Sequence, residues 1–187
     1  MLSQISKLEK PAVALVPDLA TISWHHAREE FVAKELLNRT AEIKGAMVST
    51  ESGLQAWCIW TCTWSSPGDK HGNTLHILRL VVEEADDSTA YDFSPATEEG
   101  VASVKSSPAV QAVTALFAAA QKHAAEWDMR AVELWNPNNV ALAAARELDG
   151  SVKVQAREKD SICSLKWNGK GDADDVQWVC NEKLAWC

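Results

Sequence analysis

The sequence predicts an α/β domain built on a mixed, mostly antiparallel sheet with helices packed on its faces. First, a helical segment is followed by three strand-like segments with no helix between them, so these strands are expected to be antiparallel neighbours. Second, the rest of the chain alternates helix, strand and helix, which is typical of mixed α/β domains. Third, 187 residues with 47% hydrophobic and 24% charged content suffice for one core, and we treat residues 1–187 as one domain.

The first half of the chain is expected to hold one helix and three strands. Thr21 or Ser23 can cap a helix that runs to about Asn38. Branched and aromatic residues then predict strands over 44–50, 53–64 and 74–84. The turn 51–53 joins the first two strands, and the loop 65–73 is dense in turn residues.

The second half is expected to begin with a long acidic loop over residues 85–107, which has no usable periodicity. Ser107 and Pro108 form an N-cap and N1 pair that starts a helix through Trp127. The following elements are expected to be a strand over 130–135, a helix over 136–150, strands over 151–157 and 161–167, and a tail over 170–187 that is apolar enough to pack.

Composition excludes several classes of function. The net charge is −8 and no cluster of Lys or Arg exceeds two residues, so we expect no nucleic-acid partner. No apolar run is long enough for a membrane span, so we expect no membrane association. The first residues lack the apolar core of a secretion signal and the five cysteines are odd in number, which predicts reduced thiols and a cytoplasmic protein. G-x-S-x-G, P-loop, G-x-G-x-x-G and C-x-x-C motifs are missing from the sequence.

The segment AWCIWTCTW, residues 56–64, places Cys58, Trp60, Cys62 and Trp64 on one face of a strand. The two cysteines are then about 13 Å apart at roughly 3.3 Å per residue. That separation is too large for a disulfide or a shared metal ion, so we expect no metal. The face is either a packed core layer or an indole wall, with Trp60 and Trp64 lining a cleft.

Two other groups of titratable residues are candidates for a site. His25 and His26 each precede a glutamate, Glu29 and Glu30, by four residues. This spacing predicts either two solvated His–Glu pairs on a helix or a histidine that acts as a general base, for which His26 is the candidate. Arg79 shares the face of Glu83 among apolar residues, so it must pair with Glu83 or with a ligand carboxylate. His76 faces the other way. If the loop 65–73 closes a simple hairpin, His76 lies beside Cys62, whereas a shift of the strand pairing by one residue would turn Arg79 toward the tryptophan face.

The order of elements and the segment ELWNPNNVALAAARELDG resemble the GNAT acetyltransferase superfamily. From about Val13 onwards, the strings WHHAREEFVAKEL, WCIWT, NTLHILRLVVE, LWNP and NEKLAWC are similar to the C-terminal half of the fungal lysine N6-acetyltransferase family. In GNAT proteins, the strand before the long helix splays from its neighbour and holds the pantetheine of acetyl-CoA. The resemblance therefore implies that Val81, Val82 and Asn139 contact any cofactor, and that Trp135 and Asn136 face a ligand.

The sequence departs from the GNAT pattern where the cofactor should bind. The pyrophosphate-binding motif R/Q-x-x-G-x-G/A is replaced by a long acidic span between the strand and the helix, whose carboxylates would repel a pyrophosphate. Seven residues after Asn139, where many members carry a Tyr that protonates the leaving thiolate, this chain has Arg146. The resemblance places the cofactor motif in an N-terminal half, so such a half, or a second copy in a homodimer, is a possible partner. We expect no cofactor, with acetyl-CoA as the alternative.

Three functions follow from these features. The first is a degenerate GNAT-like domain that binds a small molecule in a cleft lined by Trp and Arg. The second is an N-acetyltransferase that acts on an amine such as lysine, with Glu83 or a histidine as base. The third is an enzyme independent of CoA, a cyclase or isomerase of a biosynthetic pathway, in which His76 and Arg79 supply acid and base groups.

Overall fold

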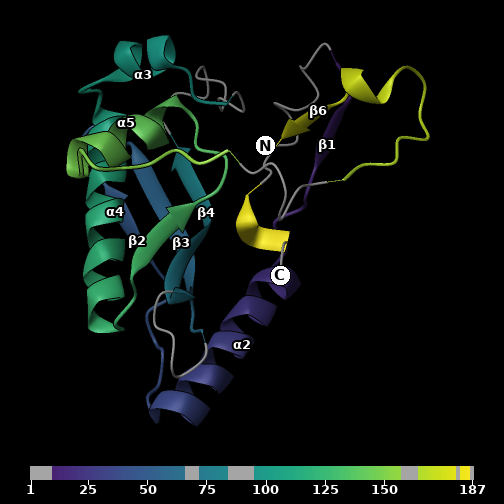
Figure 1. Ribbon diagram of the computed structural model, residues 1–187. Coiled ribbons are helices and arrows are strands. Elements are labelled where there is room, and N and C mark those ends of the chain that lie inside the picture. Colours follow the sequence, from purple (N-terminus) through teal and green to yellow (C-terminus); the bar gives the residue numbers. More distant parts are fainter. Residues whose placement is uncertain (1–9, 66–71, 84–94, 157–163, 180–181, 186–187) are drawn as a thin grey trace.

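The computed structural model describes residues 10–65, 72–83, 95–156, 164–179 and 182–185 (Figure 1). In chain order, the elements are β1 (Ala12–Ala14), α2 (Leu19–Leu37), β2 (Gly45–Ser49), β3 (Gln55–Thr63), β4 (Thr74–Glu83), α3 (Glu98–Val104), α4 (Pro108–Glu126), β5 (Ala131–Leu134), α5 (Asn139–Leu148), the 3₁₀ turn η2 (Ala173–Asp175), β6 (Gln177–Val179) and the 3₁₀ turn η3 (Lys183–Ala185). None of the described helices is long and apolar enough to cross a membrane.

The main sheet has the strand order β2-β3-β4-β5. The pairs β2–β3 and β3–β4 are antiparallel, whereas β5 runs parallel to β4. A parallel neighbour requires a crossover, and α4 makes it between β4 and β5. The mixed, mostly antiparallel sheet confirms the predicted fold class.

The two faces of the main sheet are covered differently (Figure 1). On one face α4 packs against β2, β3 and β4, and α5 packs on α4. The core lies in this layer and includes Cys58, Trp60, Leu116 and Ala120, each no more than 2% exposed. On the other face, α2 contacts β3, and η3 lies against α2 and β4.

A bulge in β4 changes which of its side chains share a face. Ile59 of β3 pairs with Arg79, but the next residue, Trp60, pairs with Ile77. Leu78 is therefore an extra residue in β4, and Arg79 falls on the same face as His76 rather than opposite to it. The predicted hairpin register was wrong by one residue even before the bulge, because Leu75 rather than His76 pairs with Cys62. That slip alone would have turned Arg79 to the tryptophan face, and the bulge, by inserting one residue, turns it away again.

Three other expectations about the elements need correction. Asp18 caps α2, accepting the Thr21 N–H at 2.7 Å, so neither Thr21 nor Ser23 is the cap. Within the expected loop 85–107, Thr97 caps the helix α3, and two glutamates in its first turn favour the positive end of the helix dipole. Residues 151–156 and 164–167 form no strand, because strand-like composition gives a strand only where the segment pairs with another, and these residues pair with none of the described strands. The intervening residues 157–163 and the loop residues 84–94 lie outside the described part.

The tail packs through two short elements. β6 pairs in parallel with β1 as a separate two-stranded sheet, in which Val13 is opposite Trp178. Farther along, Leu184 in η3 is fully buried. The residues just before and within η3 therefore approach the main sheet on the α2 side (Figure 1).

Candidate functional site

The candidate site is the place where β4 and β5 part. The two strands pair only from Thr74–Ala131 to Ile77–Leu134, and β4 then continues to Glu83 without β5 beside it. A gap between strands leaves backbone groups that need other partners. In this structure, Glu182 of the segment 182–185 supplies a partner for one of them, the Leu80 N–H.

Glu182 is the central residue of this arrangement. Its carboxylate Oε2 forms an ion pair with Nη1 of Arg79, and Oε1 accepts the backbone N–H of Leu80 at 3.3 Å. Leu80 lies three residues beyond Ile77, the last residue of β4 that pairs with β5. Glu182 and Arg79 are 7% and 5% exposed. Burial raises the pKa of Glu182, and the Arg79 guanidinium opposes that rise.

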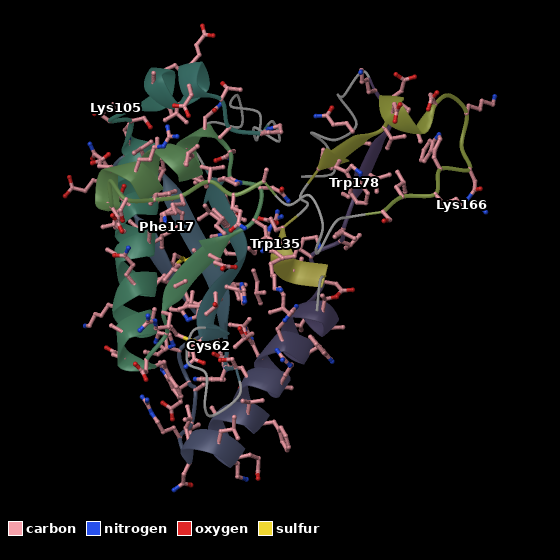
Figure 2. The ribbon with its side chains drawn as sticks, in the orientation of Figure 1. Cys62, Lys105, Phe117, Trp135, Lys166 and Trp178 are labelled. Atoms are coloured by element: carbon pink, nitrogen blue, oxygen red, sulfur yellow. The ribbon has the colours of Figure 1, made fainter. Side chains whose placement is uncertain are left out.

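The rest of the segment joins the β5 side of the gap. Lys183 places its Nζ 4.7 Å from the centroid of the Trp135 ring, which follows β5. Figure 2 shows Trp135 beside the η3 turn. His25 on α2 bonds through Nε2 to the Leu184 carbonyl at 2.8 Å. Residues 182–185 thus bridge β4, α2 and the end of β5.

His76 lies on the Arg79 face of β4, close to this segment. Its Nδ1 is 3.5 Å from Oε2 of Glu133 on β5. Burial lowers the pKa of His76 to about 4, and the charges of Lys183 and His25 add to that effect. The imidazole is therefore neutral near pH 7, and so low a pKa makes it a weak base.

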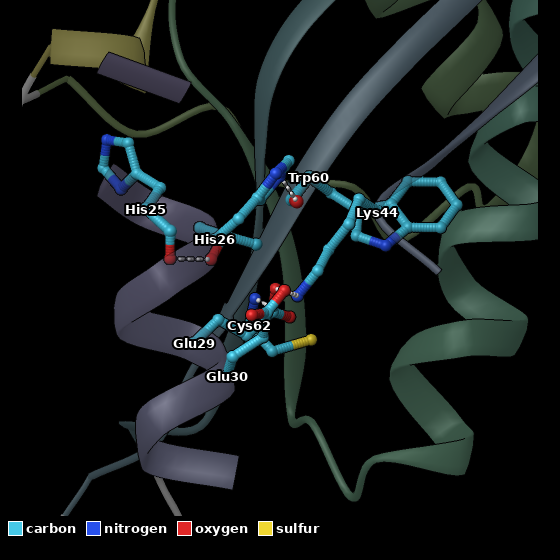
Figure 3. A network of polar contacts seen from close by, with 8 residues as sticks. His25, His26, Glu29, Glu30, Lys44, Trp60 and Cys62 are labelled. Atoms are coloured by element: carbon cyan, nitrogen blue, oxygen red, sulfur yellow. Dashed lines mark hydrogen bonds and ion pairs between the residues drawn. The ribbon is translucent and has the colours of Figure 1, made fainter. Parts of the chain in front are cut away.

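A second buried carboxylate repeats the pattern at the other edge of the sheet (Figure 3). Glu29 on α2 accepts the Cys62 backbone N–H at 2.9 Å and pairs with Lys44 Nζ at 2.6 Å. β2 begins at Gly45, opposite Ile59, so Cys62 lies beyond its reach. The expected solvated His–Glu pairs are wrong for His25 and Glu29, which are both buried and bond elsewhere.

A hollow of about 420 Å³ lies on the α2 side of β2 and β3. Its lining includes His26, Lys44, Met47, Trp57 and Ile59. His26 bonds through Nε2 to the Trp60 carbonyl at 3.2 Å. Burial, and then the charge of Lys44, lower the pKa of His26. The aromatic wall of this hollow is Trp57, which faces away from the core.

The predicted tryptophan wall lies on the core side of the sheet. Trp60 is 1% exposed, and its ring lies 5.4 Å from that of His123 on α4. Trp64 is partly buried, with its ring 5.7 Å from that of Trp127. Both contacts agree with the core-layer alternative for AWCIWTCTW. The structure therefore brings Arg79 and Trp135 together near one segment, and places Trp60 and Trp64 apart from them.

The remaining site candidates have contacts of their own. Glu83 accepts the Trp57 indole N–H at 3.4 Å rather than pairing with Arg79. Val82 packs against the core, while Val81 is partly buried. Asn136 has a left-handed backbone, with φ 50°.

Helix α5 is tied to α3 by residues in its first and last turns. The Asn139 side-chain oxygen accepts the Thr97 N–H at 2.9 Å, and Arg146 forms two 2.8 Å bonds to Glu98. These contacts tie α5 to α3. Asn139 and Arg146, which the GNAT comparison places near a cofactor, thus both hold α3, the helix within the acidic span.

Sequence reasoning missed Glu182, Lys183, Glu29 and Lys44. One signal was present: a buried Arg79 demands a carboxylate, and Glu182 is the only acid in the apolar segment VQWVCNEKLAWC. Within the described residues, no group of three or more His, Cys, Asp or Glu side chains could hold a metal ion.

The fold and the parting strands define a GNAT-like domain of the acetyltransferase-like class. The chain belongs to the family described as the LYC1 GNAT-like C-terminal domain, whose model matches residues 1–187. No curated protein and no solved structure matched the chain in the corresponding comparisons.

Proposed function

We propose that this chain is a GNAT-like domain that does not transfer acetyl groups itself and instead binds a small molecule where β4 and β5 part. The observation that carries the proposal is that the Glu182 carboxylate accepts hydrogen bonds from both the Arg79 guanidinium and the Leu80 N–H, where β4 has lost β5 as its neighbour. The binding residues would be Arg79 and Trp135, on the two sides of the gap.

The case against acetyl-CoA rests on the groups that it would need. In the GNAT proteins that the chain resembles, the splayed strand holds the pantetheine, but here the Leu80 N–H is already bonded to Glu182. Asn139 and Arg146 are engaged with α3. A net charge of −8 also disfavours a polyanionic cofactor.

The case for a small molecule rests on the kind of groups gathered there. A buried guanidinium and an indole ring are a cation and an aromatic surface, which together suit a small polar ligand. Both are covered by residues of the same short segment, Glu182 and Lys183. We further propose a cytoplasmic setting, because the buried thiols Cys58 and Cys62 are unpaired.

Two titrations test this function. Calorimetry with about 1 mM acetyl-CoA, a concentration at which even weak binding is detected, should show no saturable heat of binding. A thermal-shift screen of amino acids, amines and small organic acids should find a compound that stabilises the wild type and Trp57→Ala but not Trp135→Ala. Trp57 is the matched control because its indole lies on the separate hollow. Saturable binding of acetyl-CoA would contradict the proposal.

A second role, as a partner domain for an acetyltransferase half, is favoured by one surface. Ala20, Trp24, Ala27 and Phe31 follow a spacing of four, three and four residues on α2 and are exposed, Trp24 by 48% and Phe31 by 67%. This spacing forms an apolar stripe on the side of the helix away from the sheet. The family description as a C-terminal domain points to an N-terminal acetyltransferase domain as the occupant.

Sedimentation and pull-down with a separately expressed acetyltransferase domain of the same family test this role. Binding should be lost in Phe31→Glu and kept in Glu30→Lys, since Glu30 is exposed on the same helix but lies about 100° around it from Phe31, outside the stripe. Self-association of the chain through the stripe, without binding to the acetyltransferase domain, would favour a homodimer and contradict this role.

A further inference from the structure

We infer that the Arg79 guanidinium and the Leu80 N–H form a carboxylate-binding site, and that Glu182 occupies it as an internal ligand on a displaceable segment. The inference deepens the proposed function and rests on it, because it names the chemical class of ligand and what controls access to the site. This segment, residues 182–185, forms a plug over the site.

The geometry of the site suits a single carboxylate. One oxygen of Glu182 contacts Arg79 and the other accepts the Leu80 N–H, so the two donors are spaced to be bridged by one carboxylate group. A charged donor beside a backbone N–H makes charge-assisted hydrogen bonds, which are stronger than neutral ones. An external carboxylate would satisfy the same two donors.

The plug is a small structure that depends on contacts with the rest of the domain. η3 has three residues, and a 3₁₀ turn of that length has little stability of its own. It is held by the buried Leu184 side chain, by His25 at the Leu184 carbonyl, and by Lys183 over the Trp135 ring. Glu182 belongs to neither sheet: it follows β6, which ends at Val179, and its side chain reaches Arg79 and Leu80 of β4.

The burial of Arg79 determines which ligands can displace the plug. Removal of Glu182 alone would take the carboxylate away from a guanidinium that is 5% exposed, which is unfavourable because a buried charge-assisted contact is lost. An incoming molecule must therefore bring a negative charge to the same place. Neutral ligands and amines without an acid group do not meet this requirement. Among anions we infer a carboxylate, because one carboxylate already bridges the Arg79 guanidinium and the Leu80 N–H.

Chemical rescue tests the site with acetate as the probe. Glu182→Ala should lower the melting temperature, and acetate should raise it again in a saturable way. The expected gain is about 4 °C at an acetate concentration ten times its dissociation constant. Sodium chloride at equal ionic strength is the control salt. Wild type, in which Glu182 fills the site, should respond to acetate and chloride alike.

The double variant Arg79→Leu/Glu182→Ala is the decisive control, because it lacks the guanidinium. Acetate should not stabilise it beyond chloride. Equal shifts in the single and double variants, or no acetate-specific shift in Glu182→Ala, would overturn the inference. If Glu182→Ala does not fold in buffer alone, refolding in acetate but not in chloride supports the site, and failure in both overturns it.

This experiment can fail independently of the proposed function. Acetate rescue probes only the anion site, whereas the screen with Trp135→Ala probes binding of a larger ligand. A compound that binds through Trp135 without acetate rescue of Glu182→Ala would leave the proposed function standing and refute the carboxylate site.

Discussion

Arg79 and Glu182 form a buried ion pair between the strand that leaves its neighbour and the last described segment of the chain. The same carboxylate also accepts the Leu80 N–H beyond the end of the β4–β5 pairing. Glu29 does the equivalent for Cys62 at the end of the β2–β3 pairing, with Lys44 as its cation. The domain thus uses buried carboxylates to satisfy backbone groups where its strands lose a neighbour.

Glu29→Gln should lower the free energy of unfolding by about 2–3 kcal/mol, because it removes the charge that pairs with Lys44 and weakens the bond to the Cys62 N–H. Chemical denaturation measures this loss. Glu30→Gln is the matched control: its carboxylate is 3.5 Å from the same Lys44 Nζ, but its side chain is 56% exposed. The control should change stability by less than about 0.5 kcal/mol. Equal losses in the two variants would refute the capping role of Glu29.

Trp60→Ala should destabilise the domain by about 3–5 kcal/mol, since it empties a fully buried site against His123. Trp57→Ala, on the same strand but on the opposite face, should cost about 1 kcal/mol because its indole is only partly buried. Denaturation curves of both variants provide the comparison. Similar costs at the two positions would show that Trp60 is not the core residue.

Gly45→Ala should destabilise the domain by about 2 kcal/mol, because a Cβ at that position would lie 2.2 Å from the Cys58 carbonyl oxygen. The obstacle is backbone of the paired strand, which cannot rotate away as a side chain can. Gly150→Ala serves as the control, since no atom lies within 4 Å of the position that its new methyl group would take. The prediction fails if melting temperatures of the two variants match.

His76 should make the domain less stable in mild acid. Its pKa is about 4 in the folded state, against 6.5 for an unperturbed histidine, so between these pH values the unfolded chain binds more protons. The contribution of His76 to the free energy of unfolding is fully present above about pH 6.5 and is lost as the pH falls toward 4. Between pH 7 and pH 5, the loss amounts to about 2 kcal/mol.

The His76→Asn variant isolates this contribution from that of other groups, including Glu182, whose raised pKa acts in the opposite direction. Urea denaturation of both proteins at pH 7 and pH 5 should show a steeper loss in the wild type. Parallel pH dependence of the two proteins would mean that His76 is not buried in its neutral form.

The sequence was most informative where structure is set locally. Ser107 caps α4 with Pro108 at its first turn, as predicted, and the strands 45–49, 55–63 and 74–83 lie within the predicted segments. These features depend on neighbouring residues and on periodicity, both visible in the sequence. Residues 151–156 show the opposite case: their composition is strand-like, but a strand forms only by pairing, and composition does not show whether a segment will pair.

The candidate site was predicted only in part, and for physical reasons. Sequence reasoning identified Arg79 as a buried cation in need of an anion, because charge and apolar surroundings are readable from one strand. It did not identify Glu182, since a partner 103 residues away is fixed by tertiary packing. The bulge at Leu78 also moved Arg79 to the His76 face, and a single inserted residue has no reliable sequence signal.

A double-mutant cycle on Arg79 and Glu182 tests the central claim, that this pair holds the C-terminal segment in the gap between β4 and β5. The free energies of unfolding of wild type, Arg79→Met, Glu182→Gln and the double variant are measured by urea denaturation. Each single change should cost about 3–5 kcal/mol by leaving a buried group without its partner, and the double variant should cost less than the sum by about 2 kcal/mol or more. Additive effects within about 0.5 kcal/mol would contradict the account.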